Sequence, residues 1–141
     1  MNYFLYYQIG KIRFATGIEE IKEIARVKHL ITDNELPKNI AGFIDLRGSR
    51  ICIFDLPSFL DIQVNGNFEI IITQKDEKYI GFKVEKISGI VNADKIFPYP
   101  HIVKTKEYLK GIVKHDKEIL QILSFQKILS GTRLKAIQKF L

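Results

Sequence analysis

The chain has 141 residues, of which 46% are hydrophobic and 27% are charged, and its formal net charge is +6. This length and composition exclude a disordered chain and indicate a single globular domain over residues 1–141. No apolar run approaches the roughly 20 residues that span a bilayer, so we expect no direct membrane insertion. A single cysteine excludes an internal disulfide framework and fits a reducing compartment, which predicts a cytoplasmic protein.

The basic residues form no clear nucleic-acid motif. Many lysines lie beside glutamates, as in residues 19–23, and this pattern is typical of a solvated surface. The tyrosines and phenylalanines lie among apolar neighbours, whereas a stacking surface would alternate aromatic and basic side chains on one outward face. We therefore expect no nucleic-acid partner.

The N-terminal part of the chain predicts a hairpin and then a short amphipathic segment. Residues 3–9 and 11–16 are rich in aromatic and β-branched residues and flank Gly10, which is typical of a hairpin. Residues 18–26 place isoleucines at three-residue spacing, which predicts a short amphipathic helix or turn.

The rest of the chain predicts three further hairpins and a C-terminal helix. Their strands are expected at residues 42–46 and 51–55, 68–73 and 79–84, and 109–114 and 118–123. Residues 94–108 contain Pro98 and Pro100 and are loop-like. The tail, residues 125–141, spaces its apolar residues as an amphipathic helix does.

Two segments of the chain share one pattern. Residues 42–60 align without gaps on residues 111–129, so that Gly42 falls on Gly111 and the apolar positions coincide. Such self-similarity indicates a duplicated β unit, and many short strands with Gly-containing turns favour small barrels over a βαβ sheet. We therefore predict a mainly β fold in which two small barrels pack on one another. The expected limits of the barrels are residues 15–65 plus terminal pieces, and residues 66–125.

The two copies diverge at the turn of the repeated hairpin. The first copy has Arg47 and Gly48 where the second has Asp116 and Lys117. Gly48 is explained by turn chemistry, because glycine adopts positive φ without a steric cost. The second copy closes the same hairpin without an arginine. This comparison indicates that the turn does not require Arg47, which favours a functional role for it.

Motifs for catalysis or metal binding are weak throughout the chain. It has no phosphate-binding glycine loop and no GxSxG or HExxH motif, and its three histidines lie far apart in the sequence. Cys52 lies between Ile51 and Ile53 with no identifiable basic partner. It is expected to face the other side of the sheet or to pack between the barrels. We expect no enzymatic activity, no cofactor and no metal.

Residues 42–56 carry the most specific motif of the chain. Their sequence, GFIDLRGSRICIFDL, matches at nearly every place a pattern that reads roughly G-[VF]-[IT]-[DN]-L-R-G-x-x-[IV]-x-[IV]-x-D-L. Further matching stretches are FLYYQIG, IEEIKEI, YIGFKVEKISGI and EYLKGIVKHDKEILQILSFQKIL. By these motifs the chain resembles the CheW-like domain, the coupling module of bacterial chemotaxis signalling. The resemblance covers essentially the whole chain.

This resemblance implies a fold and a function. The fold is a pair of SH3-like five-stranded barrels joined through a hydrophobic core. The function is that of a non-catalytic adaptor, which binds the regulatory domain of the histidine kinase CheA. Such an adaptor also binds the cytoplasmic hairpin tip of methyl-accepting chemoreceptors, and these partners recruit it to membrane receptor arrays.

The resemblance also implies which residues form the binding site. In the family, an arginine in this turn and a glutamate in the segment matching IKEI are implicated in complex formation, and here these are Arg47 and Glu23. We expect them to pair across the first barrel beside Ile21 and Ile24, with Gly48 shaping the turn. An exposed ion pair contributes little to stability, so its expected purpose is geometry.

A groove between the barrels is expected to receive the receptor helices. We place it near Ile24, Arg47, Ile70 and Gly81, because a glycine lets a helix approach a strand closely. Exposed apolar strand edges would serve the kinase contact. Two alternatives stay open: a CheW-like scaffold serving type IV pilus motility or an orphan pathway, and Arg47 as a purely structural anchor.

Overall fold

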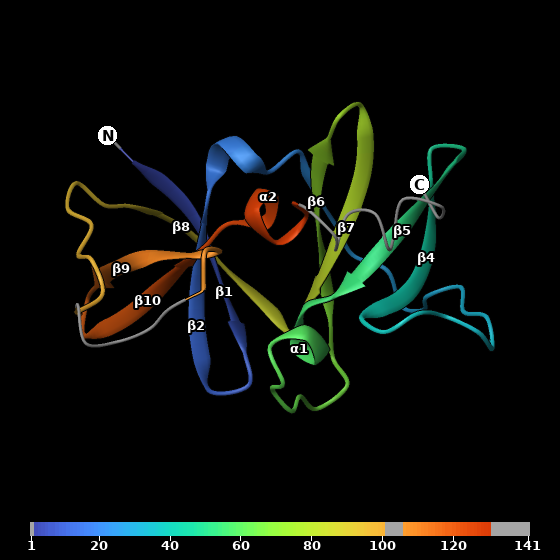
Figure 1. The fold of residues 1–141 in the computed structure, drawn as a ribbon, viewed down its shortest axis with the longest axis horizontal. Coiled ribbons are helices and arrows are strands. Elements are labelled where there is room, and N and C mark those ends of the chain that lie inside the picture. Colours follow the sequence, from blue (N-terminus) through green and yellow to red (C-terminus); the bar gives the residue numbers. More distant parts are fainter. Residues whose placement is uncertain (1, 101–105, 131–141) are drawn as a thin grey trace.

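The computed structural model describes residues 2–100 and 106–130 (Figure 1). The strands within these residues are β1 (Tyr3–Ile9), β2 (Ile12–Gly17), β3 (Glu23–Ala25), β4 (Ile40–Leu46), β5 (Ser49–Asp55), β6 (Glu69–Lys75), β7 (Lys78–Val84), β8 (Lys86–Asn92), β9 (Leu109–His115) and β10 (Glu118–Leu123). The helical elements are one 3-10 turn (Ile18–Glu20), α1 (Leu56–Phe59) and α2 (Phe125–Ile128). All four predicted hairpins are present.

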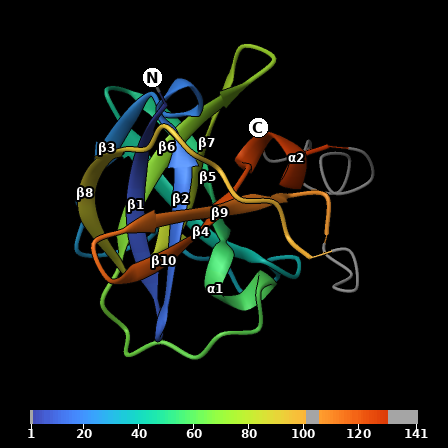
Figure 2. The ribbon, with the colours of Figure 1, turned by 90° about the vertical axis from the view of Figure 1, so that its left-hand side faces the viewer.

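The strands form two five-stranded sheets. The order is β8-β1-β2-β10-β9 in one, called the terminal sheet, and β3-β6-β7-β5-β4 in the other, called the central sheet. In the terminal sheet β10 pairs with β2 over only two residue pairs, and the β9–β10 hairpin crosses β1 and β2 (Figure 2). The predicted mainly β fold with two five-stranded units is confirmed.

The duplicated unit is visible in the structure, but each copy contributes to both sheets. The first copy runs from β1 to α1 and the second from β6 to α2. After its second strand each copy crosses over, so that β3 pairs with β6 and β8 pairs with β1. The expected limits of 15–65 and 66–125 therefore do not separate the two sheets, because β6 and β7 belong to the central sheet.

The aligned glycines of the two copies have the same conformation. Gly42 and Gly111 both have a φ of 149°, which favours glycine. A Cβ atom on Gly42 would lie 2.5 Å from the Ile31 carbonyl oxygen, and one on Gly111 would lie 2.8 Å from the Phe97 carbonyl oxygen. In both copies, a neighbouring segment lies so close to the glycine that a side chain would clash.

Three clusters of buried residues form the core. One lies inside the terminal sheet and includes Phe4 and Leu120, and another lies inside the central sheet and includes Ile53 and Ile70. The largest cluster lies between the sheets, where Phe82 and Phe125 stack with ring centroids 4.0 Å apart. Cys52 belongs to this third cluster and is 1% exposed, so it packs between the two sheets.

The two segments predicted to be helical, or for residues 18–26 a helix or turn, are described only in part by short helical elements. In residues 18–26 only Ile18–Glu20 are helical, and Glu23–Ala25 form β3, because pairing with β6 overrides the local periodicity. In the C-terminal tail, α2 covers Phe125–Ile128, and residues 131–141 lie outside the described part of the chain.

Candidate functional site

The Arg47 turn is a two-residue hairpin loop with an unusual backbone. Leu46 pairs with Ser49, which leaves Arg47 and Gly48 as the two central residues. Their φ angles are 48° and 82°, as a type I′ turn requires. Glycine and asparagine suit such positions, whereas an arginine at positive φ is uncommon. The conformation of the turn therefore does not explain why an arginine occupies this position.

Arg47 and Glu23 form the predicted ion pair. Arg47 Nη1 donates to Glu23 Oε2 at 3.1 Å, and Arg47 Nη2 donates to Glu23 Oε1, so the contact is bidentate. The hydrogen bond from Arg47 lowers the pKa of the Glu23 carboxyl and raises the pKa of the guanidinium. The Arg47 side chain is 70% exposed and that of Glu23 is 32% exposed, which leaves one edge of the guanidinium open to a partner.

The ion pair joins the two edges of the central sheet. Glu23 lies on edge strand β3, and Arg47 lies in the turn that connects edge strand β4 to β5. The hydrogen bonds between Arg47 and Glu23 therefore tie the β4–β5 turn to the opposite edge strand of this sheet.

The two predicted apolar neighbours flank this pair. Ile21 follows the 3-10 turn and Ile24 is the middle residue of β3. Both side chains are partly buried and pack against the cluster between the sheets. Their buried parts pack this segment onto the core, and only the remaining part of each side chain is available to a partner.

Ile70 and Gly81 do not lie at an open groove. Ile70 is fully buried inside the central sheet, and Gly81 is buried beside it. A Cβ atom on Gly81 would lie 2.5 Å from Ile53 Cδ1 and 2.8 Å from Ile70 Cγ2. Gly81 thus makes room for two isoleucine side chains of the core and not for a partner helix. The structure therefore places these two residues in the core, whereas the prediction placed them at a surface groove.

Tyr79 is a site residue that the sequence analysis missed. It lies on β7 and is exposed, and its phenol is close enough to Arg47 to contribute to the raised pKa of the guanidinium. Tyr79, Lys78 and Arg50 line a shallow recess beside the turn. Tyrosines within strands were expected in the core. The charged turn at residues 75–78, directly before Tyr79, was the sign in the sequence that this tyrosine is exposed.

The equivalent turn of the second copy has no such ion pair within the described residues. Asp116 takes the place of Arg47 and also has a positive φ, of 55°. Its neighbour His115 packs on the ring of Tyr6, with ring centroids 5.2 Å apart. His115 Nε2 also lies 3.7 Å from Asp116 Oδ2, so the second turn has a local contact between neighbouring residues in place of the pair between Arg47 and Glu23.

Neither a membrane-spanning helix nor a metal site is present in the described part of the chain. No helix among residues 2–100 and 106–130 is long and apolar enough to cross a membrane. Within the same residues, no three His, Cys, Asp or Glu side chains are placed to hold a metal ion.

Two interlocked five-stranded sheets built from one repeated unit define a class of duplicated β domains. The family model of the CheW-like domain matches residues 3–133, and the chain belongs to this family. Its fold is similar to that of the scaffolding protein TtCheW from Thermoanaerobacter tengcongensis, with a TM-score of 0.80. The two share 20% sequence identity, and the match covers 94% of each chain. No curated protein matches the chain in sequence.

Proposed function

We propose that this chain is a non-catalytic adaptor that couples the cytoplasmic tips of chemoreceptors to the histidine kinase CheA. Membership of the CheW-like family supports this class of function. The single observation that carries the proposal is the exposed, bidentate ion pair between Arg47 and Glu23. The receptor arrays would recruit the adaptor to the membrane through these partners.

The receptor contact is assigned to the surface around the Arg47 turn. The guanidinium is fixed by Glu23 and by its position in a two-residue turn, so little rotamer freedom remains to be lost on binding. Exposed Tyr79 adds an aromatic surface beside the charge. Aromatic and arginine side chains are those that most often dominate the energy of an interface.

The kinase contact is assigned to the terminal sheet. Ile90 on edge strand β8 and Ile119 on β10 are the most exposed large apolar side chains among the described residues, at 61% and 59%. Apolar side chains on strands at this degree of exposure favour cover by a partner. The receptor and the kinase would then occupy different sheets of one adaptor.

Co-sedimentation with two partner fragments tests the proposal. The purified chain is mixed with the regulatory domain of CheA and a chemoreceptor signalling-tip fragment, and Arg47→Glu and Glu23→Arg are compared with wild type. Arg26→Glu is the matched control, because Arg26 also forms an ion pair, with Glu69, and its side chain is 70% exposed as that of Arg47 is. We expect both site variants to fold and to lose the receptor fragment, while Arg26→Glu keeps it.

Two results would contradict the proposal. If the wild-type chain joins neither partner, the chain serves another pathway, and a CheW-like scaffold for type IV pilus motility or an orphan system becomes the better account. If Arg26→Glu loses the receptor fragment as fully as Arg47→Glu does, the contact depends on general positive charge and not on the ion-paired turn.

A further inference from the structure

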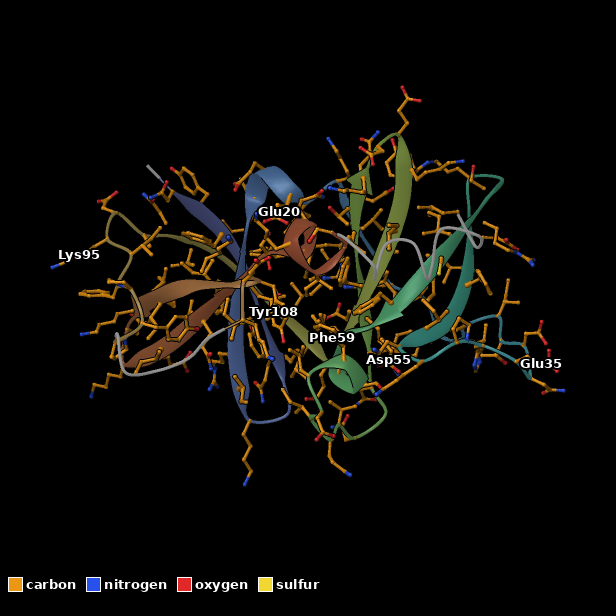
Figure 3. All side chains as sticks on the ribbon, viewed as in Figure 1. Glu20, Glu35, Asp55, Phe59, Lys95 and Tyr108 are labelled. Atoms are coloured by element: carbon orange, nitrogen blue, oxygen red, sulfur yellow. The ribbon has the colours of Figure 1, made fainter. Side chains whose placement is uncertain are left out.

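A group of polar side chains links the two sheets beside α2. This group, which we call the clasp, consists of Glu20, Thr73, Gln74 and Gln126. Gln126 lies in α2, directly after the last strand of the terminal sheet, whereas Thr73 and Gln74 lie on β6 of the central sheet. Glu20 lies in the segment that crosses from one sheet to the other. In Figure 3 it lies next to α2.

Every polar atom that the clasp uses has a partner. Gln126 Nε2 donates to the Gln74 carbonyl oxygen at 2.9 Å and to Thr73 Oγ1 at 3.1 Å. The Gln126 backbone N–H donates to Glu20 Oε1 at 2.9 Å, and Thr73 Oγ1 donates to the Glu20 carbonyl oxygen at 2.6 Å. Thr73 is fully buried, whereas Glu20, Gln74 and Gln126 are partly exposed, so the clasp runs from the core to the surface.

Gln126, the residue of the clasp that lies in α2, belongs to the second copy of the unit and has no counterpart in the first copy. Pro57 takes the place of Gln126 in the aligned segments, and proline has no side-chain donor. The contact between the sheets beside α1 is instead aromatic, with the rings of Phe59 and Tyr108 5.2 Å apart (Figure 3). Since the first copy of the repeated unit folds without this glutamine, the fold itself does not require one.

Hydrogen bonds between the sheets add a directional constraint to the apolar core that packs between them. Hydrophobic burial is non-directional, whereas hydrogen bonds depend steeply on angle and distance. Glu69 and Glu85 accept hydrogen bonds from Ile87 and Gly10 of the terminal sheet near the start of β6. The clasp holds β6 four residues further along, so the two groups together fix an angle.

We infer that Gln126 is a positioning residue that holds the central sheet at one orientation relative to the terminal sheet. The reason why the protein needs a fixed orientation rests on the proposed function. An adaptor with a receptor on one sheet and a kinase on the other must keep the two sites at a constant angle. Without the Gln126 amide, α2 loses its direct bonds to Thr73 and Gln74 of β6, and the bonds that stay in the clasp run through Glu20.

Distances between spin labels test this inference on the full chain without any partner. One pair of labels, on Lys78→Cys and Ile119→Cys, spans the two sheets, and both positions are exposed. A reference pair, on Ser88→Cys and Ile119→Cys, lies within the terminal sheet. Cys52 stays unlabelled, because it is buried and its burial raises the pKa of the thiol to about 11.

We expect Gln126→Ala to shift or broaden the distance between the sheets while the reference distance and the cooperativity of melting stay unchanged. Gln121→Ala is the matched control, because it removes one side-chain hydrogen bond, from Tyr99, within the terminal sheet region. Thr73→Val removes the central hydroxyl of the clasp at similar shape. It should act like Gln126→Ala, and the two effects should not add.

An unchanged distance between the sheets in Gln126→Ala would overturn the inference, as would equal broadening of both label pairs. If Gln126→Ala does not fold, Thr73→Val decides by the same criteria. Because no partner is present, the result stands whether or not the chain couples receptors to a kinase.

Discussion

At the scale of single residues, Arg47 is the position where function and local structure separate most clearly. Its backbone is left-handed, and its side chain crosses to the opposite edge of the central sheet. Asparagine followed by glycine is the preferred sequence for this turn. A residue that fits the turn less well and forms an exposed ion pair is best explained by what it presents to a partner.

Replacing Arg47 by asparagine should therefore separate folding from binding. We expect Arg47→Asn to keep or slightly raise the melting temperature, because asparagine tolerates the left-handed conformation and the lost ion pair is exposed. Binding of the receptor tip should weaken by roughly tenfold or more, as for an interface anchor. Calorimetric melting and titration with the tip fragment measure the two effects. A large loss of melting temperature with unchanged binding would make Arg47 a structural anchor.

The prediction of a contact between two named side chains was confirmed. The prediction of which side chains line a surface failed on a strand that is apolar on both faces. The pairing of Arg47 with Glu23 was predicted and is present. Ile70 and Gly81 were assigned to a groove but face the inside of the central sheet. Strand β6 is apolar at Ile70, Ile71 and Ile72 because both of its faces are covered, so alternation could not show which face is which.

At the scale of elements, the two strands that sequence analysis missed are those that cross between the sheets. β3 and β8 each follow a predicted hairpin and pair with a strand of the other copy. Hairpins reveal themselves because their partners are adjacent in sequence and joined by a turn. The paired residues of these crossing strands lie between 45 and 89 positions apart in the sequence, so no local turn signal marks them.

Glu20, in the first crossing segment, should make stability depend on pH. Burial raises the pKa of its carboxyl above the ordinary value of 4.5, so the folded chain binds this proton more tightly than the unfolded chain does. The resulting contribution to stability is complete below pH 4.5 and is lost as the pH rises through the folded pKa.

Glu20→Gln removes the charge and keeps an oxygen that can accept the Gln126 N–H. We expect the variant to melt higher than wild type at pH 7, by no more than a few degrees because the carboxylate is only partly buried. The difference should shrink as the pH falls through the raised pKa of the folded chain, and it should be gone below 4.5, the ordinary value of the group. Melting curves across this range measure it. A lower melting temperature at neutral pH would mean that the ionised carboxylate stabilises the clasp.

At the scale of the whole molecule, the exchange of strands makes the two halves of the sequence depend on each other. Each sheet takes two strands from one copy of the unit and three from the other. The sequence indicated the duplication, and the five-stranded composition followed from the family resemblance. Which copy supplies which strand could not be read from the sequence, because a repeat specifies its own local structure and not the partner of its third strand.

Separate halves should therefore not fold. We expect residues 1–65 and residues 66–141, expressed apart, to lack a cooperative thermal transition, because each would expose the core between the sheets and an unpaired set of strands. Mixing them should restore the transition and the dispersed amide spectrum of the intact chain. A cooperative transition in either half alone would contradict the interlocked arrangement.

The central claim is that the Arg47 turn is recognised by a partner, and a charge swap tests it most directly. The double variant Glu23→Arg with Arg47→Glu can re-form the ion pair in reverse. The link between β3 and the β4–β5 turn is then kept, while the charge presented to a partner is inverted. We predict that it melts like wild type and fails to bind the chemoreceptor tip. Binding restored to the wild-type level would show that the pair only supports the fold, and would contradict recognition of the Arg47 turn by a partner.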